Sequence, residues 1–169
     1  MNRLGIVAIA LILIAVISAG CAKKQTYIAP GGKVTVSEKQ GKAKKVEVQT
    51  ADGKATIEVA KKKITEKELG VPVYTGAKVE TAGSYEGSNK GQSEKMHNCM
   101  LTTSDDFEKV YEFYKSNLKN VKNSFNQNTD GNKMAVFSVA GDNGEEIAVN
   151  ISTDKEKKIT RIQVVRVQK

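Results

Sequence analysis

Residues 134–167 read MAVFSVAGDNGEEIAVNISTDKEKKITRIQVVRV, and this stretch decides the fold class. Apolar and polar side chains alternate with a period of two in three runs, which is typical of strands that bury one face. The runs are Met134 to Ala140, Ile147 to Ser152 and Ile159 to Val167. Glycine, asparagine, aspartate and lysine residues separate them and indicate turns. We therefore expect consecutive antiparallel strands here.

A helix is expected upstream of these strands. Ser104-Asp105-Asp106 supplies a capping hydroxyl and two carboxylates, which stabilise the positive end of a helix dipole. The apolar side chains that follow form one stripe at helical spacing: Phe107, Val110, Tyr111, Tyr114 and Leu118. Further strands are expected over Lys78 to Ser84, Lys95 to Thr103 and Val121 to Asn126, with the polar run Tyr85 to Glu94 as a loop. The predicted class is α+β, an antiparallel sheet with one main amphipathic helix over about 104–118.

A smaller β-rich segment, residues 33–63, precedes this domain. Three short runs alternate at period two: Val34 to Val36, Val46 to Gln49 and Ala55 to Val59. Asp52-Gly53 predicts a hairpin turn between the last two runs. Thr65 and Glu68 have the spacing of a capping box, so a short helical turn is expected there. We expect a boundary at this point, with the α+β domain over residues 64–169.

The N-terminus has the composition of an export signal. Arg3 is followed by an uncharged apolar run from Leu4 to Ala19, which is short for a membrane-spanning helix. Ile17-Ser18-Ala19-Gly20-Cys21 resembles the lipobox of bacterial lipoproteins. The resemblance implies that residues 1–20 are a cleaved signal peptide and that Cys21 is acylated and anchors the chain in the lipid bilayer. Because Ala22 is not the aspartate that retains enterobacterial lipoproteins at the inner membrane, it implies an outer-membrane, periplasm-facing location in a Gram-negative host.

Residues 21–32 are small and polar, and we expect them to form a flexible tether. The chain is basic, with a net charge of +8, and removing residues 1–20 takes away only Arg3 among the charged residues. The lysines cluster at Lys42, Lys44 and Lys45, at Lys61 to Lys63, and at Lys155, Lys157 and Lys158. Such clusters suit anionic lipid or other polyanions, although we favour the reading that they keep edges and turns soluble. Nucleic acid is not expected as a partner of an exported chain without a stacking motif.

Few residues carry candidate chemistry. The cysteines are Cys21 and Cys99, so an acylated Cys21 leaves Cys99 without an intramolecular disulfide. His97 and Cys99 share a strand face, which permits a nucleophile pair, but we favour structural roles for both. Two oxygen-rich runs, Thr129 to Asn132 and Asp142 to Glu146, are better explained as hairpin turns than as cation loops. Tyr74, Tyr85, Tyr111 and Tyr114 are interpreted as core or edge residues. We predict no catalytic, metal or cofactor site, and no enzyme.

A second resemblance covers residues 69–169. Val71 to Ala77, Thr102 to Asp105 and Phe113 to Lys115 resemble a domain of uncharacterised bacterial lipoproteins with a Tyr-Pro-Gly-Ala motif, from which Thr75 departs. That domain brings no known activity. We therefore expect a non-enzymatic envelope lipoprotein that binds a protein, a glycan or anionic lipid through its sheet or the Tyr85 to Glu94 loop. The alternative is an accessory scaffold subunit of an envelope assembly or transport complex. The oligomeric state is left open.

Overall fold

A single antiparallel sheet dominates the computed structural model, which describes residues 24–29, 31–39, 43–60, 64–89 and 92–169. The strands are β1 Lys24–Ala29, β2 Gly32–Lys39, β3 Ala43–Thr50, β4 Gly53–Ala60, β5 Lys78–Asn89, β6 Gln92–Thr103, β7 Val121–Thr129, β8 Asn132–Ala140, β9 Glu146–Asp154 and β10 Ile159–Gln168. The helices are α2 Glu66–Leu69, α3 Phe107–Asn117 and the 3₁₀ turn η1 Asp142–Gly144.

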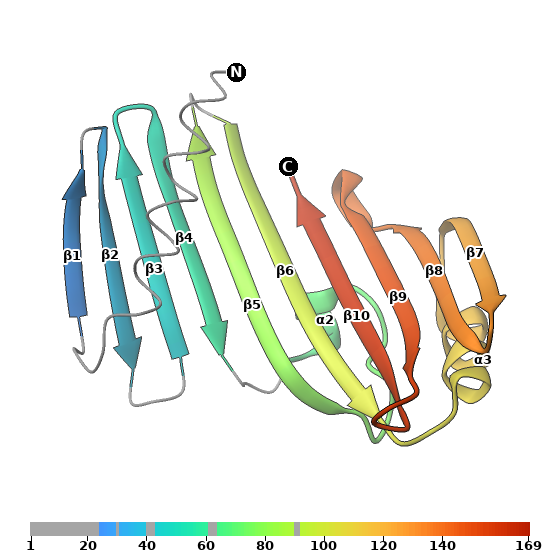
Figure 1. The fold of residues 1–169 in the computed structure, drawn as a ribbon. Helices are drawn as coiled ribbons and strands as arrows, with labels where there is room; N and C mark the ends of the chain where they lie inside the picture. Colours follow the sequence, from blue (N-terminus) through green and yellow to red (C-terminus); the bar gives the residue numbers. More distant parts are fainter. Residues whose placement is uncertain (1–23, 30, 40–42, 61–63, 90–91) are drawn as a thin grey trace.

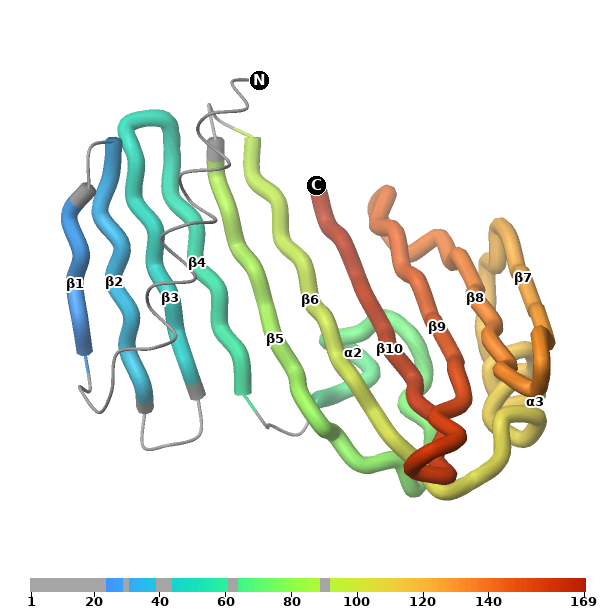
Figure 2. The backbone as a smooth tube through the Cα atoms, in the orientation of Figure 1, coloured from blue at the N-terminus to red at the C-terminus, as the bar shows by residue number. Residues whose placement is uncertain are grey.

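The strand order is β1-β2-β3-β4-β5-β6-β10-β9-β8-β7. The first six strands follow one another as a meander, and the chain then crosses through α3 to β7 at the far edge (Figure 1). From β7 it returns strand by strand until β10 pairs with β6. Figure 2 traces this path, with β1 and β7 at opposite edges of the sheet.

The predicted α+β class is wrong. Ten strands form one sheet, and α3 is the one helix longer than a single turn in the part of the chain that the structure describes. The helix expected at about 104–118 is present as α3, but it is a minor element of a sheet-dominated fold. The β-rich segment adds three of the ten strands, β2, β3 and β4, and β4 pairs with β5 along its whole length. The sheet thus runs unbroken past the boundary expected near residue 63.

The loop expected over Tyr85 to Glu94 is also wrong. Its described residues continue β5 and β6, and Tyr85 lies opposite Met96 in that pairing. Glu86 and Lys95 lie opposite each other and form an ion pair of 2.6 Å. Polar residues form strands here because the long β5–β6 hairpin is solvated on both faces at this end. The alternation at period two is therefore hidden.

The remaining strands are found where the alternation predicts them, and each is at least one residue longer than predicted. Within the expected tether, Lys24–Ala29 form β1, so a flexible tether is wrong for these residues. Thr26, Tyr27 and Ile28 favour strand structure, and all three pair with β2. The capping box is confirmed, since Thr65 and Glu68 cap α2 reciprocally.

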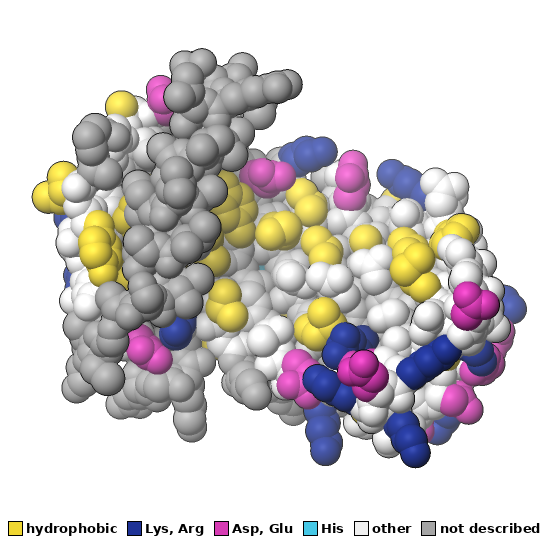
Figure 3. Space-filling model, viewed as in Figure 1, with side chains coloured by type: hydrophobic (Ala, Val, Ile, Leu, Met, Phe, Trp, Pro, Cys, Tyr) yellow, Lys and Arg dark blue, Asp and Glu magenta, His cyan; other side chains and the backbone are white. Residues whose placement is uncertain are grey.

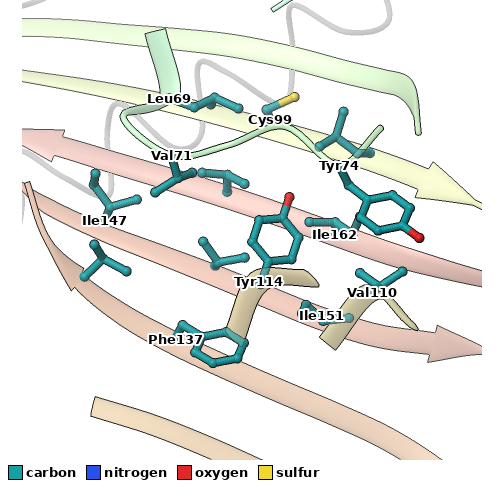
Figure 4. Close-up of a cluster of buried hydrophobic side chains, with 14 of the residues drawn as sticks. Leu69, Val71, Tyr74, Cys99, Val110, Tyr114, Phe137, Ile147, Ile151 and Ile162 are labelled. Carbon is teal, nitrogen blue, oxygen red and sulfur yellow. The ribbon is translucent and has the colours of Figure 1, made fainter. Parts of the chain in front are cut away.

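The core lies between one face of β5–β10 and the two helices. Phe107, Val110 and Tyr114 are the buried residues of α3, and Leu69 is the buried residue of α2. They pack against strand residues that include Cys99, Leu101, Val149 and Ile162. Figure 4 shows Val110 and Tyr114 within this cluster, together with Ile151 and Ile162. We call this side the helix face. No helix among the described residues is long and apolar enough to cross a membrane.

Candidate functional site on the helix-free face

Strands β2–β4 and strands β5–β10 carry their apolar side chains on opposite faces of the sheet. Residues directly opposite each other in an antiparallel pair point to the same face, so the register assigns faces strand by strand. In β5–β10 the buried residues Ala82, Cys99, Val164 and Val149 lie opposite one another in turn, on the helix face. In β2–β4 the apolar residues point to the other side, which we call the helix-free face.

One register position places an apolar side chain of each of six neighbouring strands on the helix-free face. These residues, the apolar row, are Val36 of β2, Val46 of β3, Ile57 of β4, Tyr85 of β5, Met96 of β6 and Val167 of β10. Each lies directly opposite the next. With neighbouring strands roughly 4.8 Å apart, the row is about 24 Å long.

The residues one position along these strands point to the helix face and are polar or charged. They are Ser37, Lys45, Glu58, Ser84, His97 and Arg166. Lys45 forms an ion pair of 2.9 Å with Glu47 on the same strand, and the hydrogen bond from Lys45 holds the pKa of Glu47 below its usual value. The N-terminal strands are therefore amphipathic, with their apolar side facing away from the helices.

Tyr85 stands between two glycines on the helix-free face of β5. A Cβ atom at Gly87 would overlap the Tyr85 hydroxyl, so the ring lies over Gly87. Gly83 also lacks a side chain, and a Cβ there would come within 3.1 Å of the Glu58 carbonyl oxygen. An aromatic ring packed over a strand glycine shields the backbone.

A groove of about 680 Å³ lies beside the middle of the row, where β3 to β6 run on toward the β3–β4 and β5–β6 turns. Val48, Ala55 and Tyr85 supply its apolar wall. Its rim is polar and carries charges of both signs: Thr50, Asp52, Lys54, Ser93, Glu94 and Lys169. Figure 3 views this face, and hydrophobic side chains gather over its middle while charged side chains lie mostly along its margins. The groove contains part of the Tyr85 to Glu94 stretch that the sequence singles out for binding.

A second polar cluster, around Arg166, holds the fold together. Arg166 Nη2 lies 2.7 Å from a Glu145 carboxylate oxygen, and Nη1 donates to the carbonyls of Lys67 and Glu68 at 2.7 and 3.1 Å. Burial alone would raise the pKa of Glu145, but hydrogen bonds from Gln168 and Arg166 hold it below its usual value. Arg166 thus satisfies the free carbonyls of α2 and joins that helix to the sheet. We attribute the adjoining cavity of about 270 Å³ to the packing of α2 against the sheet and not to a ligand site.

The other candidates from the sequence have structural roles. Cys99 is fully buried, and burial raises the pKa of its thiol to about 11, which opposes a nucleophilic role. His97 lies on the same face and interacts electrostatically with Glu86 and Glu145. Both oxygen-rich runs are turns: Asp130 and Gly131 have positive φ between β7 and β8, and η1 connects β8 to β9. Within the described ranges, no three His, Cys, Asp or Glu side chains cluster as a metal site would require.

The tyrosines divide between the two faces. Tyr74 and Tyr114 are buried in the core, and Tyr111 stacks on Phe137, whereas Tyr85 lies in the apolar row. The Tyr74 hydroxyl donates to Asp105 at 2.6 Å, and burial raises the pKa of Tyr74 to about 12. Cys21, Lys42 and Lys61 to Lys63 lie outside the described residues.

Comparison with known proteins gives one match. Residues 79–158 match the START domain-like family model, which covers β5 to the turn after β9. A START-like domain suggests a ligand-binding module, in agreement with a binding role. Strands β1–β4, which supply three residues of the apolar row, precede the matched part. Neither the curated proteins nor the solved structures include a match.

Proposed function

We propose that this chain is a membrane-anchored bacterial envelope lipoprotein and that its sheet is a non-enzymatic binding module. The anchor is acylated Cys21, and the support for it is the export-like sequence and the resemblance of residues 17–21 to a lipobox. Each buried CH₂ of an acyl chain contributes ~0.8 kcal/mol, so two or three chains hold such a protein in the bilayer. In a Gram-negative host the module faces the periplasm from the outer membrane.

The apolar row is the observation that carries the binding role. Six neighbouring strands present apolar side chains on the face that the helices leave open, and a groove with a charged rim adjoins the middle of the row at Tyr85. Pockets that combine an apolar wall with a few polar groups are typical of small-molecule sites. The ligand that fits best is amphiphilic, with its apolar part along the row and its polar part at the rim near Lys54 and Lys169.

A fluorescent dye that combines an apolar ring system with a charged group tests this proposal. The chain from Ala22 onward contains every described strand and helix, and 1-anilinonaphthalene-8-sulfonate is titrated into it while fluorescence is measured. Ile57→Ser removes about 1.5 kcal/mol of apolar contact, so the dissociation constant should rise about tenfold. The matched control is Thr56→Ser, whose side chain lies on the opposite face of β4. Equal affinities of Ile57→Ser and Thr56→Ser would contradict the proposal.

The anchor needs its own test. Intact mass is measured for the detergent-extracted protein and for Cys21→Ala. We expect a mass above that of residues 21–169 by the weight of a diacylglyceryl group with or without a third acyl chain, and no such addition in Cys21→Ala. An unmodified native mass would overturn the anchor and leave the binding test standing.

The alternative, an accessory scaffold subunit, has a specific observation in its favour. The edge strand β7 is exposed along its whole length and can pair with a further strand. Co-purification from detergent extracts separates the two functions, because a scaffold subunit is recovered with its complex.

A further inference from the structure

Strand β7 offers an open edge. It pairs with β8 on one side, and it is the last strand in the sheet order. All nine of its residues are exposed, so no described residue covers its outer side. The N–H and C=O groups that point outward are therefore available to another strand.

This edge has little of the protection that natural edge strands carry. Its sequence, VKNSFNQNT, contains one charge, Lys122, and no proline. Its only register irregularity lies between Val121 and Asn123, at the start of the strand. From Asn123 to Thr129 the strand is regular and uncharged. Charges, prolines and bulges are the usual means of preventing edge pairing, and this part of β7 lacks all three.

Phe125 is the middle residue of β7, and it is 52% exposed. It lies opposite Val136 of β8, which places both on the helix-free face. Met134, on the same face of β8, is 42% exposed. Phe125 therefore lies at the free edge, where a partner strand would cover it, whereas Met134 lies one strand further in.

We propose that two copies of this chain pair through β7, antiparallel and around a two-fold axis at Phe125. In this register Phe125 lies opposite Phe125 of the second copy. Lys122 lies opposite Asn128, and Ser124 lies opposite Asn126. The only charge of the strand thus meets an amide, and no like charges face each other. An aromatic pair at the centre of an antiparallel contact is a favourable cross-strand pair.

This self-complementary chemistry is the reason to choose a second copy over an unrelated strand. An isologous contact needs the same patch to fit itself, and the β7 sequence does so when it is centred on Phe125. The two-fold axis is perpendicular to the sheet, so both helix-free faces lie on the same side of a continuous sheet. The two apolar rows then face the same way. Because the contact is a single strand pair, the dimer is weak and concentration-dependent.

Sedimentation velocity over a concentration series tests the proposal, with the chain from Ala22 onward. The wild type should shift from monomer to dimer as concentration rises. Phe125→Lys and Phe125→Glu each place like charges opposite each other and should raise the dissociation constant at least tenfold. An equimolar mixture of these two variants should dimerise again, because lysine then meets glutamate.

Met134→Lys is the matched control, since it adds the same charge to the same face one strand away from the edge. It should dimerise like the wild type. A wild type that stays monomeric throughout the series would overturn the proposal. So would a Phe125→Lys variant that associates normally, or a Lys–Glu mixture that remains monomeric. Loss of association in Met134→Lys equal to that in Phe125→Lys would also count against the β7 register.

Discussion

The two faces of the sheet should differ sharply in their sensitivity to the same mutation. Ile162 on β10 is fully buried, opposite Leu101 and Ile151, so Ile162→Ala leaves a cavity in the core. We expect this substitution to lower the free energy of unfolding by about 2–5 kcal/mol. Ile57 on β4 is only half-buried on the helix-free face. With ~0.8 kcal/mol per buried CH₂ and partial burial, Ile57→Ala should cost about 1 kcal/mol.

Urea unfolding of the chain from Ala22 onward measures both costs. For a slope of about 2 kcal/mol/M, Ile162→Ala should lower the midpoint by about 1–2.5 M and Ile57→Ala by about 0.5 M, with slopes unchanged. The comparison is matched, because both positions are isoleucines within strands. If Ile57→Ala destabilises the protein as much as Ile162→Ala, the helix-free face is part of a core, and the reasoning that makes it a binding face is refuted.

Three further predictions concern the helix face. The pKa of Glu145 is lower in the folded state, so the stabilisation that its carboxylate provides is present above the unfolded-state pKa of about 4.3 and is lost as pH falls through the folded-state pKa. Glu145→Gln should therefore lose less stability on acidification than the wild type. Thermal unfolding at a series of pH values measures this, and identical pH profiles would contradict it. Cys99 should resist a thiol reagent in the folded chain from Ala22 onward and react at once in denaturant, because its thiol is buried and has a pKa of about 11. Prompt labelling of the native protein would contradict this, since it would show that the core around Cys99 opens. The Tyr114 hydroxyl is buried and has no hydrogen-bond partner within bonding distance among the described residues, and burial raises its pKa although the nearby backbone of Tyr74 opposes this. Tyr114→Phe should therefore be neutral or stabilise by about 1 kcal/mol in urea unfolding, and a clear loss of stability would point to a bonded hydroxyl.

Most strands of this sheet could be predicted because alternation is a local property. Ile147 to Ser152 and Ile159 to Val167 show it within single runs, and both are strands. The capping box at Thr65 is equally local and is confirmed. The Tyr85 to Glu94 stretch was predicted wrongly because its glycines and polar residues mask the alternation. Pairing with β4 and β6 stabilises it as strand instead.

No single strand reveals that the apolar side chains of β2–β4 and β5–β10 lie on opposite faces of the sheet. Alternation groups Ile57 with Val59, but only the pairing of Ile57 with Tyr85 shows that they point away from the helices. The same limit applies to the contacts of Arg166, which join α2 to the sheet. Arg166 meets Glu145 and the Lys67 carbonyl, which lie 21 and 99 residues away in the chain. Such contacts depend on strand order, which local patterns do not fix.

The central claim is that an amphiphile binds along the apolar row of the helix-free face. Isotope-labelled chain from Ala22 onward, titrated with 1-anilinonaphthalene-8-sulfonate, tests it most directly through the side-chain methyl signals of the two faces. We predict shift changes at Val36, Ile57 and Met96, and unchanged signals at Leu101 and Ile162. Changes confined to Leu101 and Ile162, with the row unaffected, would contradict the account.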